Sequence, residues 1–252
     1  MCLIALAYKV HQRYPLIIAA NRDEFLDRPT DPARFWPAEP HILAGRDRRA
    51  GGTWLGVTTG GRFAALTNYR DLRLPRLQGP SRGALVRRAL EAGFVPADTS
   101  MFEGFNLLYG GLDEMRYHSN IEPVDRPLEP GIHGLSNHLL NTRWPKVLRA
   151  KEALTRIIAD DEPSVEALFE LLADDTPAPD DRLPDTGLDL DRERALSSIC
   201  ITTNGYGTHC SSVILVDAAG VVTFEERTRE PRSAARYSFQ VGRSQHPAEF
   251  RR

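Results

Sequence analysis

The chain has 252 residues, of which 41% are hydrophobic and 26% charged, with 32 basic against 34 acidic side chains and a net charge of −2. This length can bury a substantial core, and the composition is that of an ordinary globular protein. The balanced charge excludes the basic footprint of a nucleic-acid-binding protein, and no apolar run is long enough to span a membrane.

Two strands are predicted at the start of the chain, Cys2–Lys9 and Leu16–Ala20, with breaker-rich residues 11–15 between them. The second strand leads into the polar segment Asn21-Arg22-Asp23-Glu24. Polar groups at the end of a buried strand need partners, so the segment is either a salt-bridged strand end or part of a functional site. If the two strands pair antiparallel, the end of the second lies beside the start of the first. Arg22 or Asp23 then comes close to Cys2.

The rest of the chain predicts more hairpins and a block of helices. Residues 28–40 are Pro-rich and irregular, and the acidic, aperiodic residues 174–194 predict a long surface loop. Hairpin-joined strands with helices in a block favour antiparallel α+β layers, and a single domain over residues 1–252. Strands are predicted at 51–57, 63–68, 105–109, 115–118, 132–135, 197–203, 212–217, 221–226 and 237–241, and helices at 81–92, 144–158 and 164–172.

Cys2 directly follows the initiator methionine. If Met1 is removed, Cys2 carries a thiol and a free α-amine, and an amine with a pKa of about 8 can accept the thiol proton, directly or through water. A neighbouring cation such as Arg22 would stabilise the thiolate. The alternative interpretation is that a small residue simply follows the methionine.

Two asparagines, Asn68 and Asn137, lie at the ends of predicted strands. A side-chain amide there can donate to an oxyanion, although asparagine is also common in turns. The Cys200, His209 and Cys210 group lacks a fourth metal ligand at a recognisable spacing, so no metal and no cofactor is predicted. Three cysteines, an odd number, without a secretory signal favour a reducing compartment, and we expect the cytoplasm.

Several short motifs together resemble the NRDE family, also called the transport and Golgi organization 2 family. They follow the family order from residue 1 to about residue 240, which covers essentially the whole chain. The matching segments are 1–2, 19–25 with 28–29, 35–36, 51–56, 64–70, 104–107, 134–137, 144–146 and 205–208.

The resemblance implies a fold like that of the N-terminal nucleophile (Ntn) hydrolases, a four-layer αββα sandwich with two antiparallel sheets between helical layers. It also implies site roles. Cys2 would be the nucleophile with its α-amine as base, Arg22 would lie against the thiolate, and Asp23 would orient the amine. Asn137 would donate to the oxyanion, and Asn68 is a second candidate for that pocket.

One departure from the family pattern concerns position 209. The family usually has Tyr-Gly-Thr-Arg where this chain has Tyr206-Gly207-Thr208-His209. An arginine can hold an anion through a planar fork of donors that histidine reproduces poorly. A catalytic or anion-binding role for His209 is therefore in doubt.

Two functions from different classes follow from these observations. The first is a cysteine Ntn hydrolase that cleaves an amide or acyl bond of a small molecule. The second is a non-catalytic carrier for an amphipathic ligand such as haem, acyl-CoA or another lipid-like molecule, which the resemblance also implies. Residues 174–194 are either a solvated lid or a docking surface for a partner.

Overall fold

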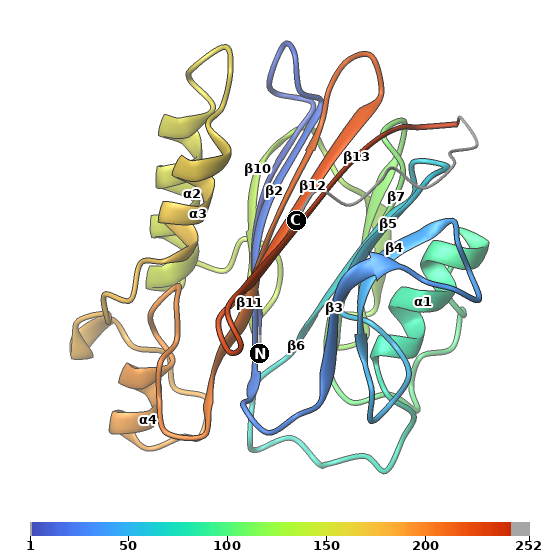
Figure 1. Ribbon diagram of the computed structural model, residues 1–252. Helices are drawn as coiled ribbons and strands as arrows, with labels where there is room; N and C mark the ends of the chain where they lie inside the picture. The colour runs from blue at the N-terminus through green and yellow to red at the C-terminus, as the bar shows by residue number, and fades with distance from the viewer. Residues whose placement is uncertain (1, 243–252) are drawn as a thin grey trace.

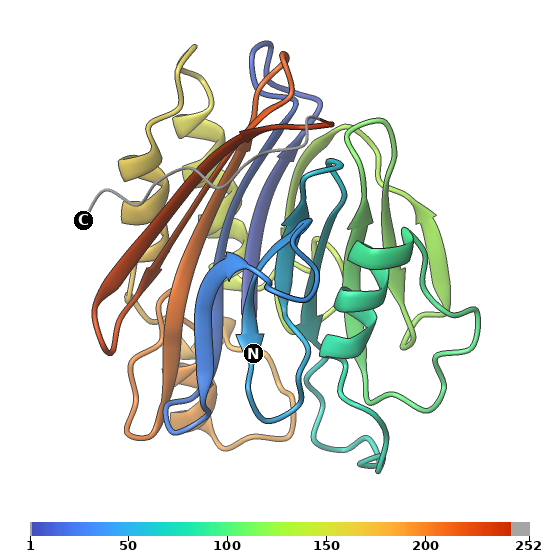
Figure 2. The same cartoon turned by 45° about the vertical axis from the view of Figure 1, so that its right-hand side comes forward.

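Two antiparallel sheets stacked face to face form the centre of the molecule in the computed structural model, which describes residues 2–242. Helices α2 (Pro145–Ile157) and α3 (Val165–Leu172) cover the outer face of the six-stranded sheet, and α1 (Gly83–Ala92) covers the seven-stranded sheet (Figure 1). Seen after a 45° turn, the same layers remain separate (Figure 2). The predicted four-layer αββα architecture is confirmed.

The six-stranded sheet has the order β10-β1-β2-β11-β12-β13 and the seven-stranded sheet the order β3-β4-β5-β6-β7-β8-β9. The strands of the first sheet are β1 Cys2–Tyr8, β2 Leu16–Phe25, β10 Gly131–Leu135, β11 Tyr206–Val216, β12 Val221–Thr228 and β13 Ser233–Gln240. Those of the second are β3 Thr30–Phe35, β4 Ile42–Asp47, β5 Leu55–Thr58, β6 Phe63–Asn68, β7 Phe105–Gly110, β8 Met115–Ser119 and β9 Val124–Pro127.

Strands β1 and β2 lie inside their sheet, and both of their faces are covered. Alternate residues of β1, such as Ile4 and Leu6, pack against the second sheet, whereas Leu3 and Ala5 pack under α2 and α3. A strand that is buried on both faces has an apolar residue at nearly every position instead of an alternating pattern. Each Leu or Ile buried in this way contributes about 1.5–3 kcal/mol to folding.

Three predicted segments differ from the structure. Residues 28–40 contain the edge strand β3, in which Pro32 falls at a register shift, where a missing N–H is tolerated. Residues 197–203 form no strand apart from one bridge between Thr202 and Gly207. The N–H of Cys200 donates to Asp174 and that of Ile201 donates to the Thr208 hydroxyl, so neither is available to a ladder.

The segment predicted as a surface loop, 174–194, is in part an ordered and packed element. It contains the 3₁₀ turn η1 (Asp180–Arg182) and most of α4 (Leu190–Ala195). Glu193 of α4 is buried, accepts from both the N–H and the hydroxyl of Thr186, and pairs with Arg70 at 2.8 Å. This buried ion pair holds the segment against the sandwich, which a solvated lid would not require. None of the helices within residues 2–242 is long and apolar enough to cross a membrane.

Candidate active site

The polar segment at the end of β2 is divided between the two faces of the six-stranded sheet. Arg22 pairs in register with Cys2 of β1 and with Cys210 of β11, so these three side chains share the face toward the second sheet. Asn21 and Asp23 point to the opposite face, toward the helices. The amide of Asn21 donates to the carbonyls of Leu172 and Ile199 at 2.8 and 2.9 Å.

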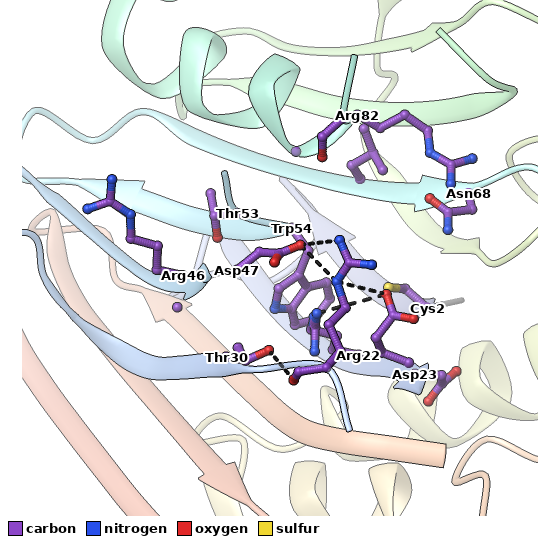
Figure 3. A pocket seen from close by; sticks show the side chains of 16 residues that line it. Cys2, Arg22, Asp23, Thr30, Arg46, Asp47, Thr53, Trp54, Asn68 and Arg82 are labelled. Carbon is purple, nitrogen blue, oxygen red and sulfur yellow. Dashed lines mark hydrogen bonds and ion pairs between the residues drawn. The ribbon is translucent and has the colours of Figure 1, made fainter. Parts of the chain in front are cut away.

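Cys2 and Arg22 line a cavity of about 120 Å³ between the sheets (Figure 3). Arg22 is only 5% exposed, and its Nη2 lies 3.9 Å from Oε2 of Glu24. Its Nη1 is buried and has no hydrogen-bond partner among residues 2–242. A buried guanidinium with a donor to spare is suited to a transient anion, such as a thiolate or an oxyanion.

The environment of Cys2 disfavours a permanent thiolate. Burial raises the pKa of the Cys2 thiol above its usual value, the negative charge of Asp23 raises it further, and Arg22 opposes both effects. The thiol is therefore protonated at neutral pH, and its use as a nucleophile requires a base that removes the proton during the reaction.

Asp23 is held on the helix side of the sheet. Its Oδ1 accepts a hydrogen bond from the Thr208 hydroxyl at 2.7 Å, and its backbone carbonyl accepts one from the Tyr206 hydroxyl at 3.0 Å. Burial raises the pKa of Asp23, while the positive charge of Lys146 and the bond from Thr208 work against that rise. Asp23 also lines the cavity of Cys2, and its charge acts on the Cys2 thiol.

The two candidate oxyanion donors occupy different positions. Asn68, at the end of β6, lines the cavity together with Cys2. Asn137 is fully buried, is absent from that lining, and donates through Nδ2 to the backbone carbonyl of Asn68 at 3.0 Å. The neighbouring Ser136 hydroxyl donates to the Cys2 carbonyl at 3.1 Å and to Asn137 Oδ1 at 3.2 Å. The geometry thus favours Asn68 as the donor and Asn137 as a link between β1 and β6.

Lys146 is a residue of this region to which the sequence analysis gave no role. It is the second residue of α2, is 1% exposed, and donates to the carbonyl of Leu196 at 3.1 Å. Burial lowers its pKa to about 8, and the charge of Asp23 opposes that shift. A helix N-terminus is an unfavourable place for a cation. The negative charge of Asp23 offsets part of this cost, an interaction between distant segments that no local signal in the sequence reveals.

The remaining candidates lie apart from the thiol. His209 occupies a β-bulge in β11, where its Nε2 lies 2.8 Å from the carbonyl of Phe25, and it does not line the cavity of Cys2. Cys200 and Cys210 are buried and free. Among residues 2–242, no three His, Cys, Asp or Glu side chains are grouped so as to hold a metal ion.

A second, larger cavity of about 1020 Å³ adjoins the first. The two share four lining residues, Glu24, Arg28, Asn68 and Arg82. The larger cavity has an apolar portion, which includes Phe25, Leu72 and Leu74, and also several arginines. Its volume is at the upper end of the range for small-molecule sites. A ligand lodged here would extend from the neighbourhood of Cys2 toward solvent.

Comparison with known proteins identifies relatives over most of the chain. The family profile described as Transport and Golgi organisation 2 matches residues 1–231. The Transport and Golgi organization protein 2 homolog of Bos taurus is 37% identical over 242 residues, which cover 85% of this chain and 87% of the relative. Transport and Golgi organization protein 2 of Drosophila melanogaster is 29% identical over 245 residues, 85% of this chain and 86% of the relative.

The architecture also matches that of a solved enzyme. The C2A mutant of the conjugated bile acid hydrolase from Clostridium perfringens superposes with a TM-score of 0.53 at 8% identity, covering 94% of this chain and 92% of that one. At this identity the likeness establishes the fold alone. The chain therefore belongs to the Transport and Golgi organisation 2 family and has the fold of the Ntn hydrolases.

Proposed function

We propose that the protein is a cysteine Ntn hydrolase that cleaves an amide or acyl bond of a small molecule, with Cys2 as nucleophile after removal of Met1. The observation that carries the proposal is the pairing of Cys2 with Arg22 on the wall of a cavity that adjoins a ligand-sized space. The α-amine of Cys2 is the base, because the thiol is protonated at neutral pH and needs a proton acceptor.

In the first half of the reaction the amine takes the thiol proton while sulfur attacks the carbonyl carbon. Arg22 and Asn68 stabilise the negative charge that develops on sulfur and then on the oxyanion. The bond to the leaving group breaks, the protonated amine returns its proton to that group, and a thioester remains on Cys2. In the second half, water gives a proton to the amine and attacks the thioester, which releases the acid and regenerates the thiol.

Asp23 and Lys146 act in this scheme without touching the substrate. Asp23, held by Thr208, orients the α-amine and stabilises its protonated form. Lys146 supplies a buried positive charge that favours the ionised form of Asp23. Asn137 is assigned as a positioning residue that fixes the backbone around Asn68.

The test compares wild-type protein with Cys2→Ala and Cys2→Ser against a library of acyl amides, with Cys200→Ala as the matched control. Cys200 is also buried and free but does not line the cavity. Turnover should disappear in both Cys2 variants and persist in the control. Intact mass should show loss of Met1 and a first iodoacetamide label on Cys2. Retained turnover in Cys2→Ala, or an active protein that keeps Met1, would refute the proposal.

A second candidate function is a carrier for an amphipathic ligand such as haem, acyl-CoA or a lipid-like molecule. The size and mixed lining of the larger cavity favour it. Titration separates the two functions, because a carrier binds one equivalent of ligand equally well in the wild type and in Cys2→Ala, and releases no product. The cytoplasm remains our proposal for its location, supported by three free cysteines.

A further inference from the structure

Exposed apolar side chains gather at one end of the sandwich. Of the ten large hydrophobic residues that are exposed within residues 2–242, six lie on just three segments, the end of β2, the loop after β6 and the start of α4. Figure 1 shows these three segments together at the lower end of the molecule. We call the six residues the apolar rim: Phe25, Leu26, Leu72, Leu74, Leu77 and Leu190.

Half of the apolar rim borders the mouth of the larger cavity. Phe25, Leu72 and Leu74 line that cavity themselves, as do Leu188, just before α4, and Asp191 of α4. The exposed fractions are large, 61% for Phe25, 52% for Leu72 and 43% for Leu74. Single exposed apolar residues are normal, but a group of them around one opening is typical of a binding surface.

Arginines alternate with the leucines of the rim. The loop reads Leu72-Arg73-Leu74-Pro75-Arg76-Leu77. Arg73 is paired with Asp71 and Asp185, but arginines outnumber acidic residues in the lining of the mouth. Arg49 and Arg76 line the same mouth, are exposed, and make no ion pair within the described chain. Leucines beside arginines that carry no ion pair, such as Arg49 and Arg76, match the boundary layer of a bilayer, where apolar side chains enter the acyl region and cations meet phosphate groups.

We propose that the apolar rim docks on a membrane surface that contains anionic lipids, with the mouth of the larger cavity facing the bilayer. A protein partner seated on this rim would close the cavity. A bilayer covers the same surface while it delivers an amphipathic molecule directly into the opening. The proposal does not depend on whether Cys2 is catalytic, since it concerns only how the cavity is approached.

The test is co-sedimentation with vesicles of phosphatidylcholine alone and of phosphatidylcholine with phosphatidylserine. The wild type should bind the anionic vesicles better, and added salt should weaken this binding. Leu72→Asp with Leu74→Asp should lower the affinity by about tenfold or more, because two leucines can no longer enter the acyl region. Arg49→Gln with Arg76→Gln should remove the preference for phosphatidylserine.

Two surface variants serve as matched controls. Leu148 on α2 is 42% exposed, close to the value for Leu74, so Leu148→Asp introduces the same charge outside the rim. Arg88→Gln removes an exposed arginine from α1. Both should bind vesicles like the wild type. As an independent readout, Leu74→Trp should give a tryptophan emission that shifts to the blue with anionic vesicles and is quenched by brominated lipid.

Three results would overturn the proposal. The first is that the wild type does not bind vesicles. The second is that Leu148→Asp lowers vesicle binding as much as Leu72→Asp with Leu74→Asp does. The third is a dimer in sedimentation velocity that the rim variants dissociate while vesicles are ignored. In that case the rim is an interface between two copies of the chain rather than a membrane surface.

Discussion

The two faces of the six-stranded sheet use neighbouring residues of β2 in different ways. On the face toward the second sheet, Arg22 lies beside Cys2 at a cavity and keeps a donor without a partner. On the side toward the helices, Asn21 and Asp23 are bonded to backbone and side-chain groups of other elements, and Asp23 also lines the cavity. Asn21 is therefore committed to structure, whereas Arg22, Asp23 and Glu24 border the cavity of Cys2.

The difference follows from strand geometry and from the cost of burying polar groups. Successive side chains of a strand point to opposite faces, so the four polar residues of this segment find their partners on different sides of the sheet. A sealed polar group needs a partner for each donor and acceptor, whereas a group at a cavity can leave one for a ligand. Variants on the two faces should accordingly separate stability from reactivity.

The largest expected effect is on stability, from Asn21→Ala on the helix face. The carbonyls of Leu172 and Ile199 would lose a buried donor and the Ser211 hydroxyl its acceptor, which should cost about 3 kcal/mol in the free energy of unfolding. Denaturant unfolding measures this change. The alkylation rate of Cys2 should stay within about twofold of the wild type, because Asn21 does not face the thiol. A parallel fall in that rate would show that the two faces are coupled.

Arg22→Met on the cavity face should have the opposite profile. Loss of the guanidinium beside the thiol should slow alkylation of Cys2 by about a hundredfold, equivalent to about 2.7 kcal/mol in the barrier. Stability should change little or rise, because a buried charge with an unused donor is removed. Stopped-flow alkylation of protein lacking Met1 gives the rate. Arg22→Lys keeps the charge, so its alkylation rate should fall between those of the wild type and Arg22→Met. A wild-type rate in Arg22→Met would contradict the role of Arg22 in stabilising the thiolate.

Local patterns in the sequence predicted those parts of this arrangement that depend on neighbours along the chain. Strands β1 and β2 were predicted from their apolar runs, and their register confirms that Arg22 comes beside Cys2. The helix after Ser164 is confirmed too, with the serine hydroxyl accepting from Ala167 N–H. Short-range pairing and capping of this kind depend on a few adjacent residues.

The rest of the site depends on contacts between distant elements. Lys146 and Thr208 reach Asp23 from α2 and β11, more than 120 residues away, and nothing near either residue indicates a shared partner. Residues 197–203 have the apolar content of a strand, but tertiary hydrogen bonds to Asp174 and Thr208 hold their backbone in an irregular path. Such long-range competition overrides local propensity.

Lys146→Met should change how stability depends on pH. The pKa of Lys146 falls from 10.5 to about 8 in the folded protein because of burial. Between these values the unfolded chain binds more protons than the folded one, so wild-type stability gains from rising pH. From pH 7 to pH 9.5 the wild type should gain about 2 kcal/mol relative to Lys146→Met. Urea unfolding at the two pH values measures the difference. An equal change in the free energy of unfolding of both proteins between the two pH values would contradict a lowered pKa of Lys146.

The smallest expected effect on stability comes from Thr208→Val, which removes the hydroxyl that bonds Asp23. The Thr208 hydroxyl donates to Asp23 Oδ1 and accepts from the N–H of Ile201, so its loss should cost about 1 kcal/mol of stability. Removal of a bond to the charged form should raise the pKa of Asp23 further, because burial already favours the neutral acid. The acid limb of the rate profile at Cys2 should then move to higher pH. Thr208→Ser keeps the hydroxyl and should retain the wild-type profile. An unchanged profile in Thr208→Val, or an equal shift in Thr208→Ser, would show that the hydrogen bond from the Thr208 hydroxyl does not set the protonation of Asp23.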